Sequence, residues 1–128
     1  MSGQNKKRPV NLYLPGIRLP VGGVVSILHR LSGVLLVISL PYGLILLQQS
    51  LSGADAYARV MNELHRLPQR VLLFLVLIAL AHHALAGIRH LLLDLDVGIT
   101  RAAGRAGAWL VLAGTGVFAI AAGVCLFP

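Results

Sequence analysis

Three long apolar runs constrain this chain more than any other feature of its sequence. They cover about residues 22–47, 71–93 and 106–127. A helix that crosses a bilayer needs about 20 predominantly apolar residues, and each run meets that length. Lipid offers unpaired backbone groups no partners, so runs of this kind are stable in a membrane as helices. The sequence therefore predicts an all-α membrane protein with three transmembrane helices, in one domain over residues 1–128 with a tail at 1–21.

The composition supports a membrane protein and argues against nucleic acid as a partner. Of the 128 residues, 57% are hydrophobic and 12% are charged, whereas soluble domains average about 25% charged residues. The net charge is +7, but the basic residues gather at the ends of the apolar runs, without a separate basic domain. Cys125 is the single cysteine, so no internal disulfide is expected.

Turn-forming residues separate the three runs. The stretches SGADA (residues 52–56) and DVGIT (residues 96–100) have the composition of turns. Pro41 lies inside the first run, where it predicts a kink and not a helix end. The basic tail resembles the start of a secretory signal, but the run that follows is too long and lacks a cleavage site. We therefore expect the first helix to be retained.

The distribution of lysine and arginine predicts the orientation. The tail contains Lys6, Lys7, Arg8 and Arg18, the second connection contains Arg101 and Arg105, and the first connection contains Arg59, Arg66 and Arg70. With three spans, the tail and the second connection share one side, and the positive-inside rule makes that side cytoplasmic. The C-terminus then faces outward. Arg30 and Arg89, each a few residues inside a span, add to the same bias.

Ionisable residues crowd the second half of the second run, in AHHALAGIRHLLLD (residues 81–94). At about 100° per residue, one stripe of this helix contains Ala79, His83, Gly87, His90 and Asp94. His82 points away from this stripe. The small residues one turn above and below His83 predict a shallow groove in which a flat macrocycle can reach the imidazole, a common haem ligand. The alternative is a hydrogen bond from His83 to a neighbouring helix, with the small residues as ordinary packing positions.

The first run contains a second polar group, in SILHR (residues 26–30). Two potential cations, His29 and Arg30, lie one turn from the hydroxyl of Ser26. In hydrocarbon such groups need a partner, and haem propionates or a quinone carbonyl would serve. Alternatively, Arg30 extends to lipid phosphates while Ser26 bonds to its own helix. A shared polar pocket would also explain why the same depth of the membrane contains Arg30, Arg89, His90 and Asp94.

Three motifs together resemble the cytochrome b subunit of succinate dehydrogenase, one of the two membrane anchors of respiratory complex II. They are RPVNLYLPGIRLP, SILHRLSG and HHALAGIRHLLLDL. The resemblance implies a three-span anchor, with its N-terminus in the cytoplasm, that forms half of a heterodimeric bundle. It also implies a bacterial inner membrane and a complex that serves electron transport and the tricarboxylic acid cycle.

The resemblance also implies roles for particular residues. The histidine that precedes GIRH, His83 and not His82, matches the family's axial ligand to haem b iron. Ser26 and Arg30 match positions that line the ubiquinone pocket, where Arg30 stabilises negative charge on the quinone. His29 matches a position near the haem propionates, and Arg30 adjoins it. His90 and Asp94 match positions at the cytoplasmic end of the helix that carries the haem ligand. His90 is expected near the propionates and Asp94 near the quinone.

The partners implied are a flavoprotein that oxidises succinate, an iron–sulfur subunit and a second anchor. The chain has no Rossmann-type glycine loop and no cysteine cluster, so we expect it to hold neither flavin nor iron–sulfur centre. It is therefore not expected to oxidise succinate itself. We expect the second haem ligand from the other anchor, because His29 is predicted to lie nearer the cytoplasmic edge than His83. Two alternatives remain open: an anchor of a menaquinone-linked fumarate reductase, and a scaffold or transport subunit without haem.

Overall fold

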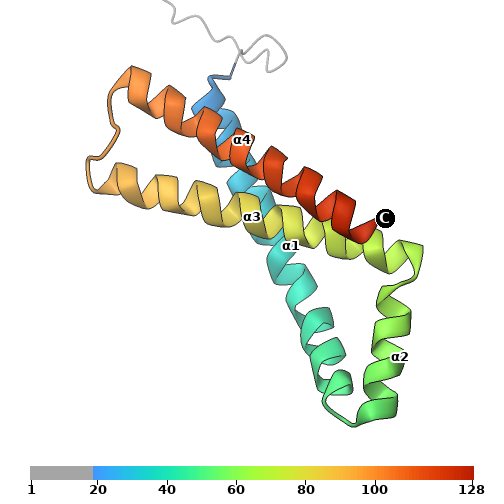
Figure 1. Cartoon of the computed structure of the whole chain (residues 1–128). Helices are drawn as coiled ribbons and strands as arrows, with labels where there is room; N and C mark the ends of the chain where they lie inside the picture. The colour runs from blue at the N-terminus through green and yellow to red at the C-terminus, as the bar shows by residue number, and fades with distance from the viewer. Residues whose placement is uncertain (1–18) are drawn as a thin grey trace, which may run out of the picture.

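Helices make up the part of the chain that the computed structural model describes, residues 19–128 (Figure 1). In chain order these helices are α1 (Val21–Ser50), α2 (Ala54–Leu64), α3 (Leu67–Asp94) and α4 (Arg101–Leu126). By length and composition α1, α3 and α4 can each cross a membrane, which confirms the predicted all-α fold with three spans. The basic residues of the tail, Lys6, Lys7, Arg8 and Arg18, lie outside the described residues.

α2 is a helix that the sequence interpretation did not include. The turn predicted at SGADA is shorter than expected, because α1 ends at Ser50 and α2 already begins at Ala54. Gly53 makes this turn with a φ of 138°, a conformation that favours glycine. Val60 is buried, whereas Asp55 and Arg59 face outward. α2 is therefore an amphipathic helix with one apolar side. It is shorter and more polar than a helix that spans a membrane.

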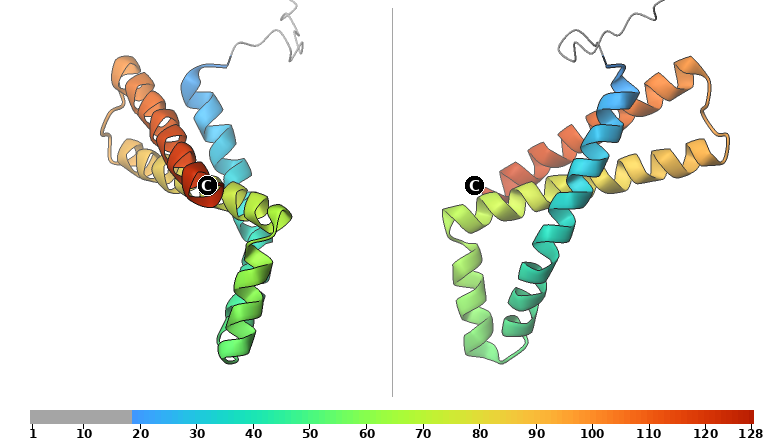
Figure 2. Two further views of the ribbon diagram at one scale, coloured as in Figure 1. Left: turned by 45° about the vertical axis from the view of Figure 1, so that its right-hand side comes forward. Right: turned by 180° about the vertical axis from the view of Figure 1, so that it is seen from behind.

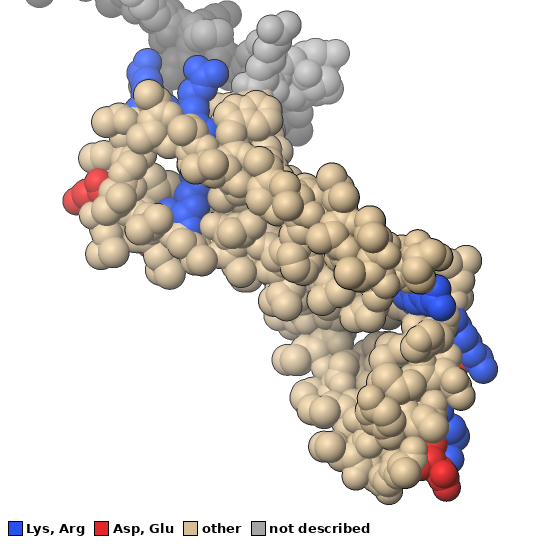
Figure 3. Space-filling view, in the orientation of Figure 1, with Lys and Arg blue, Asp and Glu red and all other residues tan. Residues whose placement is uncertain are grey.

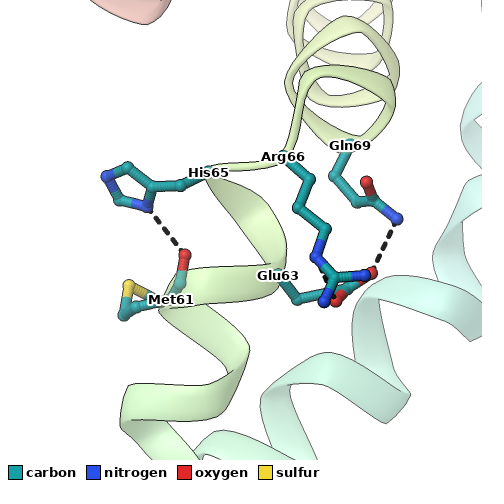
Figure 4. Close-up of polar contacts among 5 residues, drawn as sticks. All are labelled: Met61, Glu63, His65, Arg66 and Gln69. Carbon is teal, nitrogen blue, oxygen red and sulfur yellow. Dashed lines mark hydrogen bonds and ion pairs between the residues drawn. The ribbon is translucent and has the colours of Figure 1, made fainter.

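A compact set of polar contacts joins α2 to α3 (Figure 4). Gln69 Nε2 donates to Glu63 Oε1 at 2.8 Å, and Arg66 Nε lies 3.3 Å from Glu63 Oε2. The ring of His65 donates from Nδ1 to the carbonyl of Met61 at 2.7 Å. Pro68 lies in the first turn of α3, where its missing N–H costs no helical hydrogen bond. These contacts fix the sharp bend between the two helices (Figure 1).

α3 and α4 run side by side in opposite directions along most of their lengths (Figures 1 and 2). The turn between them matches the prediction made from DVGIT: Asp96 and Gly98 have φ values of 60° and 80°. The Thr100 hydroxyl then caps α4 by accepting from the Ala103 N–H at 3.2 Å. This turn sets the two long helices against each other as a hairpin.

α1 crosses the α3–α4 hairpin with its first half and diverges from it with its second half, which runs beside α2 (Figure 2). It continues as helix through Pro41, as the sequence predicts. At the crossing, a small core is formed by Val25, Ala86, Ala108 and Val111. Two of these four are alanines, which allow membrane helices to approach closely. The three spans therefore meet near the end of the bundle where α1 begins.

Most of the apolar surface of the spans is open. Val37 and Ile38 on α1 are 71% and 73% exposed, and Ile120 on α4 is 71% exposed. On the face shown in Figure 3, charged residues lie mainly near the ends of the elongated molecule and a broad uncharged region separates them. Such a surface needs lipid or other apolar helices around it.

Candidate functional site

His83 extends from α3 towards α1 and makes two polar contacts there. Its Nδ1 lies 3.1 Å from the carbonyl oxygen of His29 and 3.2 Å from the hydroxyl oxygen of Ser32. A carbonyl oxygen can only accept, so Nδ1 carries the ring proton. The other ring nitrogen, Nε2, is then unprotonated and has a free lone pair. This assignment follows from the acceptors around Nδ1.

A glycine on α1 makes room for the imidazole of His83. A Cβ added to Gly33 would lie 3.0 Å from His83 Cε1 and 3.4 Å from Nδ1. Contacts that short are tighter than ordinary packing, so a side chain at Gly33 would require the ring of His83 to shift by a few tenths of an ångström. The close approach of α1 to α3 at this point therefore depends on Gly33.

Two further histidines lie beside His83. The ring of His29 stacks on that of His83, with centroids 4.1 Å apart and planes at 15°. The ring of His90 lies 5.1 Å from His29 at a tilt of 54°. All three side chains are half-buried. The sequence placed His29 and His90 near the cytoplasmic end and His83 deeper, and the structure brings the three rings into one cluster, which we call the histidine cluster.

The groove expected around His83 is partly filled. The expectation was that Ala79 and Gly87 leave open space above and below the imidazole. Ala79 is buried instead, and a Cβ on Gly87 would lie 3.5 Å from His29 Nε2, so the His29 ring lies over Gly87. The space over Gly87 also lets the rings of His29 and His83 stack, and the expected difference in their depth stays a prediction.

His82 faces the opposite side of α3, as the helical periodicity predicts. Its Nδ1 lies 3.2 Å from the hydroxyl oxygen of Thr115 on α4, and the residue is 5% exposed. The Thr115 hydroxyl donates its own proton to the carbonyl of Val111 at 2.8 Å, so it accepts from His82. His82 therefore serves the contact between α3 and α4, away from the histidine cluster.

The residues expected at a quinone site lie on α1 and α3, near the histidine cluster. Ser26 is half-buried one turn before His29, Arg30 is exposed, and Asp94 is exposed at the end of α3. Arg89 lies between the helices: its Nη2 donates to the Gly104 carbonyl on α4 at 3.1 Å, and the same nitrogen would lie 3.4 Å from a Cβ added to Gly22 on α1. The shared polar pocket expected to include Arg89 stays a prediction.

Two cavities lie elsewhere in the described part of the chain. One, of about 520 Å³, lies between the second half of α1 and α2 and is lined by residues that include Arg59 and Val60. The other, of about 280 Å³, lies between α3 and α4 beside Arg89. Neither is lined by Ser26, Arg30 or His83.

Sequence reasoning missed Ser32 and Thr115, the two hydroxyl residues that contact the adjacent histidines. Ser32 lies three residues after His29 and directly before Gly33, which places it on the face of α1 that meets α3. That spacing in SILHRLSG could have indicated Ser32. Thr115 had no such signal, because its pairing with His82 depends on how α4 packs against α3.

Comparison with known proteins gives consistent matches over nearly the whole chain. The family described as "Succinate dehydrogenase/Fumarate reductase transmembrane subunit" matches residues 4–122. A protein of Coxiella burnetii named "Succinate dehydrogenase cytochrome b556 subunit" is 32% identical over 124 residues, which cover 96% of this chain and 99% of that protein. Three apolar helices of membrane-crossing length agree with a transmembrane subunit. The chain therefore belongs to the family of succinate dehydrogenase/fumarate reductase transmembrane subunits.

Proposed function

We propose that this chain is a membrane anchor of a succinate:ubiquinone oxidoreductase and binds haem b together with a second anchor subunit. The observation that carries the proposal is the state of His83. Its Nδ1–H is committed to the His29 carbonyl and the Ser32 oxygen, which leaves Nε2 free to ligate iron. Metal-ligating histidines characteristically donate their other ring N–H in this way. The name of the Coxiella burnetii relative, a cytochrome b556 subunit, supports the same assignment.

The histidine cluster fits haem better than a bare metal ion. Three imidazoles gather there, yet within residues 19–128 no group of three His, Cys, Asp or Glu residues is arranged to hold an ion. Haem brings four nitrogen ligands of its own, so His83 could be the single residue of this chain that holds its iron. When bound, it supplies a one-electron carrier. We assign His29, His90 and Arg30 to its anionic propionates, because carboxylates at membrane depth need donors or cations.

The second axial ligand is proposed to come from the partner anchor. A second histidine that held the same haem would have to leave space for the macrocycle between its ring and that of His83. His29 and His83 stack with centroids 4.1 Å apart, which leaves no room for a macrocycle between them. A histidine on a helix of another subunit, packed on the open apolar surface, meets the requirement.

We assign Ser26, Arg30 and Asp94 to the site where ubiquinone is reduced. Ser26 hydrogen-bonds a quinone oxygen, and Arg30 stabilises the negative charge that develops on the quinone as electrons arrive. The exposure of Arg30 and Asp94 supports a site that is completed by neighbouring subunits. Oxidation of succinate to fumarate in the flavoprotein releases two electrons and two protons. The iron–sulfur subunit carries the electrons to ubiquinone, which takes up two electrons and two protons to become ubiquinol.

The proposed location is the bacterial cytoplasmic membrane, with the N-terminus and the α3–α4 turn in the cytoplasm. Arg101 and Arg105 at the start of α4 support this orientation through the positive-inside rule. Arg30 and Asp94 then lie near the cytoplasmic edge, on the side where soluble iron–sulfur and flavin subunits can dock.

The haem assignment is tested on the intact complex, purified in mild detergent with all its subunits. We expect His83→Ala to remove or severely weaken the reduced-minus-oxidised b-type spectrum, because it removes the iron ligand. His82→Ala is the matched control: it alters the neighbouring imidazole, which contacts Thr115 and not α1, and should keep most of the spectrum. Equal loss in both variants, or a full spectrum in His83→Ala, would refute the ligand assignment. A wild-type complex without haem would favour a scaffold or transport subunit.

A menaquinone-linked fumarate reductase is the second candidate, because the matched family includes fumarate reductase subunits. The Coxiella burnetii relative favours succinate dehydrogenase by its name. Extraction and identification of the bound quinone, with redox titration of the haem, separates the two. Menaquinone in the purified complex would support the fumarate reductase.

A further inference from the structure

The hydroxyl of Ser32 forms a closed triangle with His83 and the backbone of His29. Ser32 Oγ lies 2.8 Å from the His29 carbonyl oxygen and 3.2 Å from His83 Nδ1, and Nδ1 lies 3.1 Å from the same carbonyl. We infer that Ser32 is a positioning residue for the haem ligand: with the His29 carbonyl, it accepts the Nδ1–H of His83 and fixes the tautomer that presents Nε2 to iron. The inference rests on the proposed ligation of haem iron by His83.

Proton counting gives the direction of each hydrogen bond in the triangle. The carbonyl of His29 has no proton, so it accepts from both Ser32 and His83. The single proton of the Ser32 hydroxyl is used in the 2.8 Å bond to that carbonyl, which leaves its oxygen as an acceptor towards His83. The Nδ1–H of His83 is then shared between two acceptors. The reverse tautomer would place a lone pair on Nδ1 against a carbonyl oxygen at 3.1 Å, which is repulsive.

Burial strengthens this arrangement. Ser32 is 8% exposed, so lipid or water has little access to its hydroxyl. Hydrogen bonds in a low-dielectric interior are stronger than at a wet surface. Gly33, directly after Ser32, receives the edge of the same imidazole. Two adjacent residues of α1 therefore position the His83 ring: Ser32 by a hydrogen bond and Gly33 by close packing.

The simpler explanation is that Ser32 only satisfies its own hydroxyl. Ser39, further along α1, donates to the carbonyl three residues before it at 2.9 Å, as Ser32 does at 2.8 Å. Within residues 19–128 the Ser32 hydroxyl contacts a histidine, His83, whereas the Ser39 hydroxyl contacts none. Ser39 is therefore a control that keeps the backbone bond and lacks the proposed role.

Acceptors on Nδ1–H make an imidazole a more basic ligand, and a more basic ligand stabilises ferric over ferrous haem. Removing the Ser32 oxygen leaves the His29 carbonyl as an acceptor, so the loss is partial. We expect Ser32→Ala to raise the haem midpoint potential and to speed haem loss about tenfold, the lower end of effects seen when a ligand's hydrogen-bond partner is removed.

The experiment uses the whole complex, with assembly checked by co-purification of all subunits. Two readouts are taken: the haem midpoint potential by redox titration, and the rate of haem transfer to excess apomyoglobin. Ser32→Ala should shift both, Ser39→Ala should shift neither, and Ser32→Thr, which restores the hydroxyl, should return towards wild type. If Ser32→Thr does not assemble, the comparison of Ser32→Ala with Ser39→Ala decides.

The outcomes separate this inference from the proposal on which it rests. If His83→Ala keeps its haem, the ligand assignment fails and the role of Ser32 fails with it. If His83→Ala loses haem while Ser32→Ala matches Ser39→Ala in both readouts, the positioning role of Ser32 alone is overturned.

Discussion

At the scale of single residues, two adjacent histidines have different surroundings. His83 meets a carbonyl and a hydroxyl on α1, whereas His82 meets a hydroxyl on α4. A step of about 100° per residue predicts this divergence from sequence alone. The stacking of His29 on His83 could not be predicted in the same way. The stacking depends on how α1 and α3 are placed relative to each other. The periodicity of either helix alone does not predict that placement.

Arg30 provides the test of the quinone site at this scale. We expect Arg30→Ala to lower succinate-to-ubiquinone electron transfer by about 10²–10³, because it removes a cation that stabilises developing negative charge. Succinate oxidation by a soluble dye that takes electrons from the other subunits should survive. Arg30→Lys should recover part of the activity, because a flexible ammonium does not reproduce the guanidinium fork.

Arg59→Ala is the matched control, since Arg59 is also exposed but lies on α2, in the other half of the molecule. The measurement is the ratio of quinone to dye reduction rates in assembled complex. Normal ubiquinone reduction by Arg30→Ala would reassign Arg30 to lipid headgroups or subunit contacts.

At the scale of the elements, the sequence predicts the spans well and their surroundings poorly. The predicted first span, residues 22–47, is α1 at Val21–Ser50, and the third, 106–127, is α4 at Arg101–Leu126. α4 begins before the predicted third span because the Thr100 cap starts a helix whose first turns include Arg101 and Arg105, which lie outside the apolar run. α2 was missed because an amphipathic helix of 11 residues contains no long apolar run.

The crossing of α1 over α3 yields a prediction of its own. Gly33→Ala should reduce haem occupancy of the assembled complex, because the new methyl would lie 3.0 Å from His83 Cε1 and displace the ring. Overpacking of this kind typically costs about 1–3 kcal/mol. Gly43→Ala, on the same helix with nothing within 4 Å of the added Cβ, is the control and should bind haem normally. The measurement is haem per complex from the pyridine haemochrome spectrum, and equal occupancy in both variants would contradict the prediction.

At the scale of the whole molecule, the distribution of charge and the shape of the bundle predict which end faces the cytoplasm. The histidine cluster lies towards the end of the bundle where α1 begins and where the α3–α4 turn lies, and the arm of α1 and α2 extends away from it (Figures 1 and 2). Arg101 and Arg105 belong to the same end. The proposed electron path requires this end to face the cytoplasm.

Reporter fusions test this orientation. In a bacterium, alkaline phosphatase fused after Pro128 should be active, because the C-terminus is expected in the periplasm, and the same enzyme fused at Gly98 should be inactive. Green fluorescent protein at the two positions is the reciprocal control. The inverse pattern would place Arg30 and Asp94 on the side away from the soluble subunits.

The half-buried histidine cluster also bears on the fate of the chain before it is assembled. Without another subunit, His29, His83 and His90 are only half-buried and Arg30 is exposed, and polar groups in or near hydrocarbon are costly until something pairs with them. Cellular proteases remove chains that remain in such marginal states. We therefore expect the lifetime of a newly made copy to be set by how soon a partner subunit reaches it, which would keep the amounts of the two anchors matched without separate control of their synthesis.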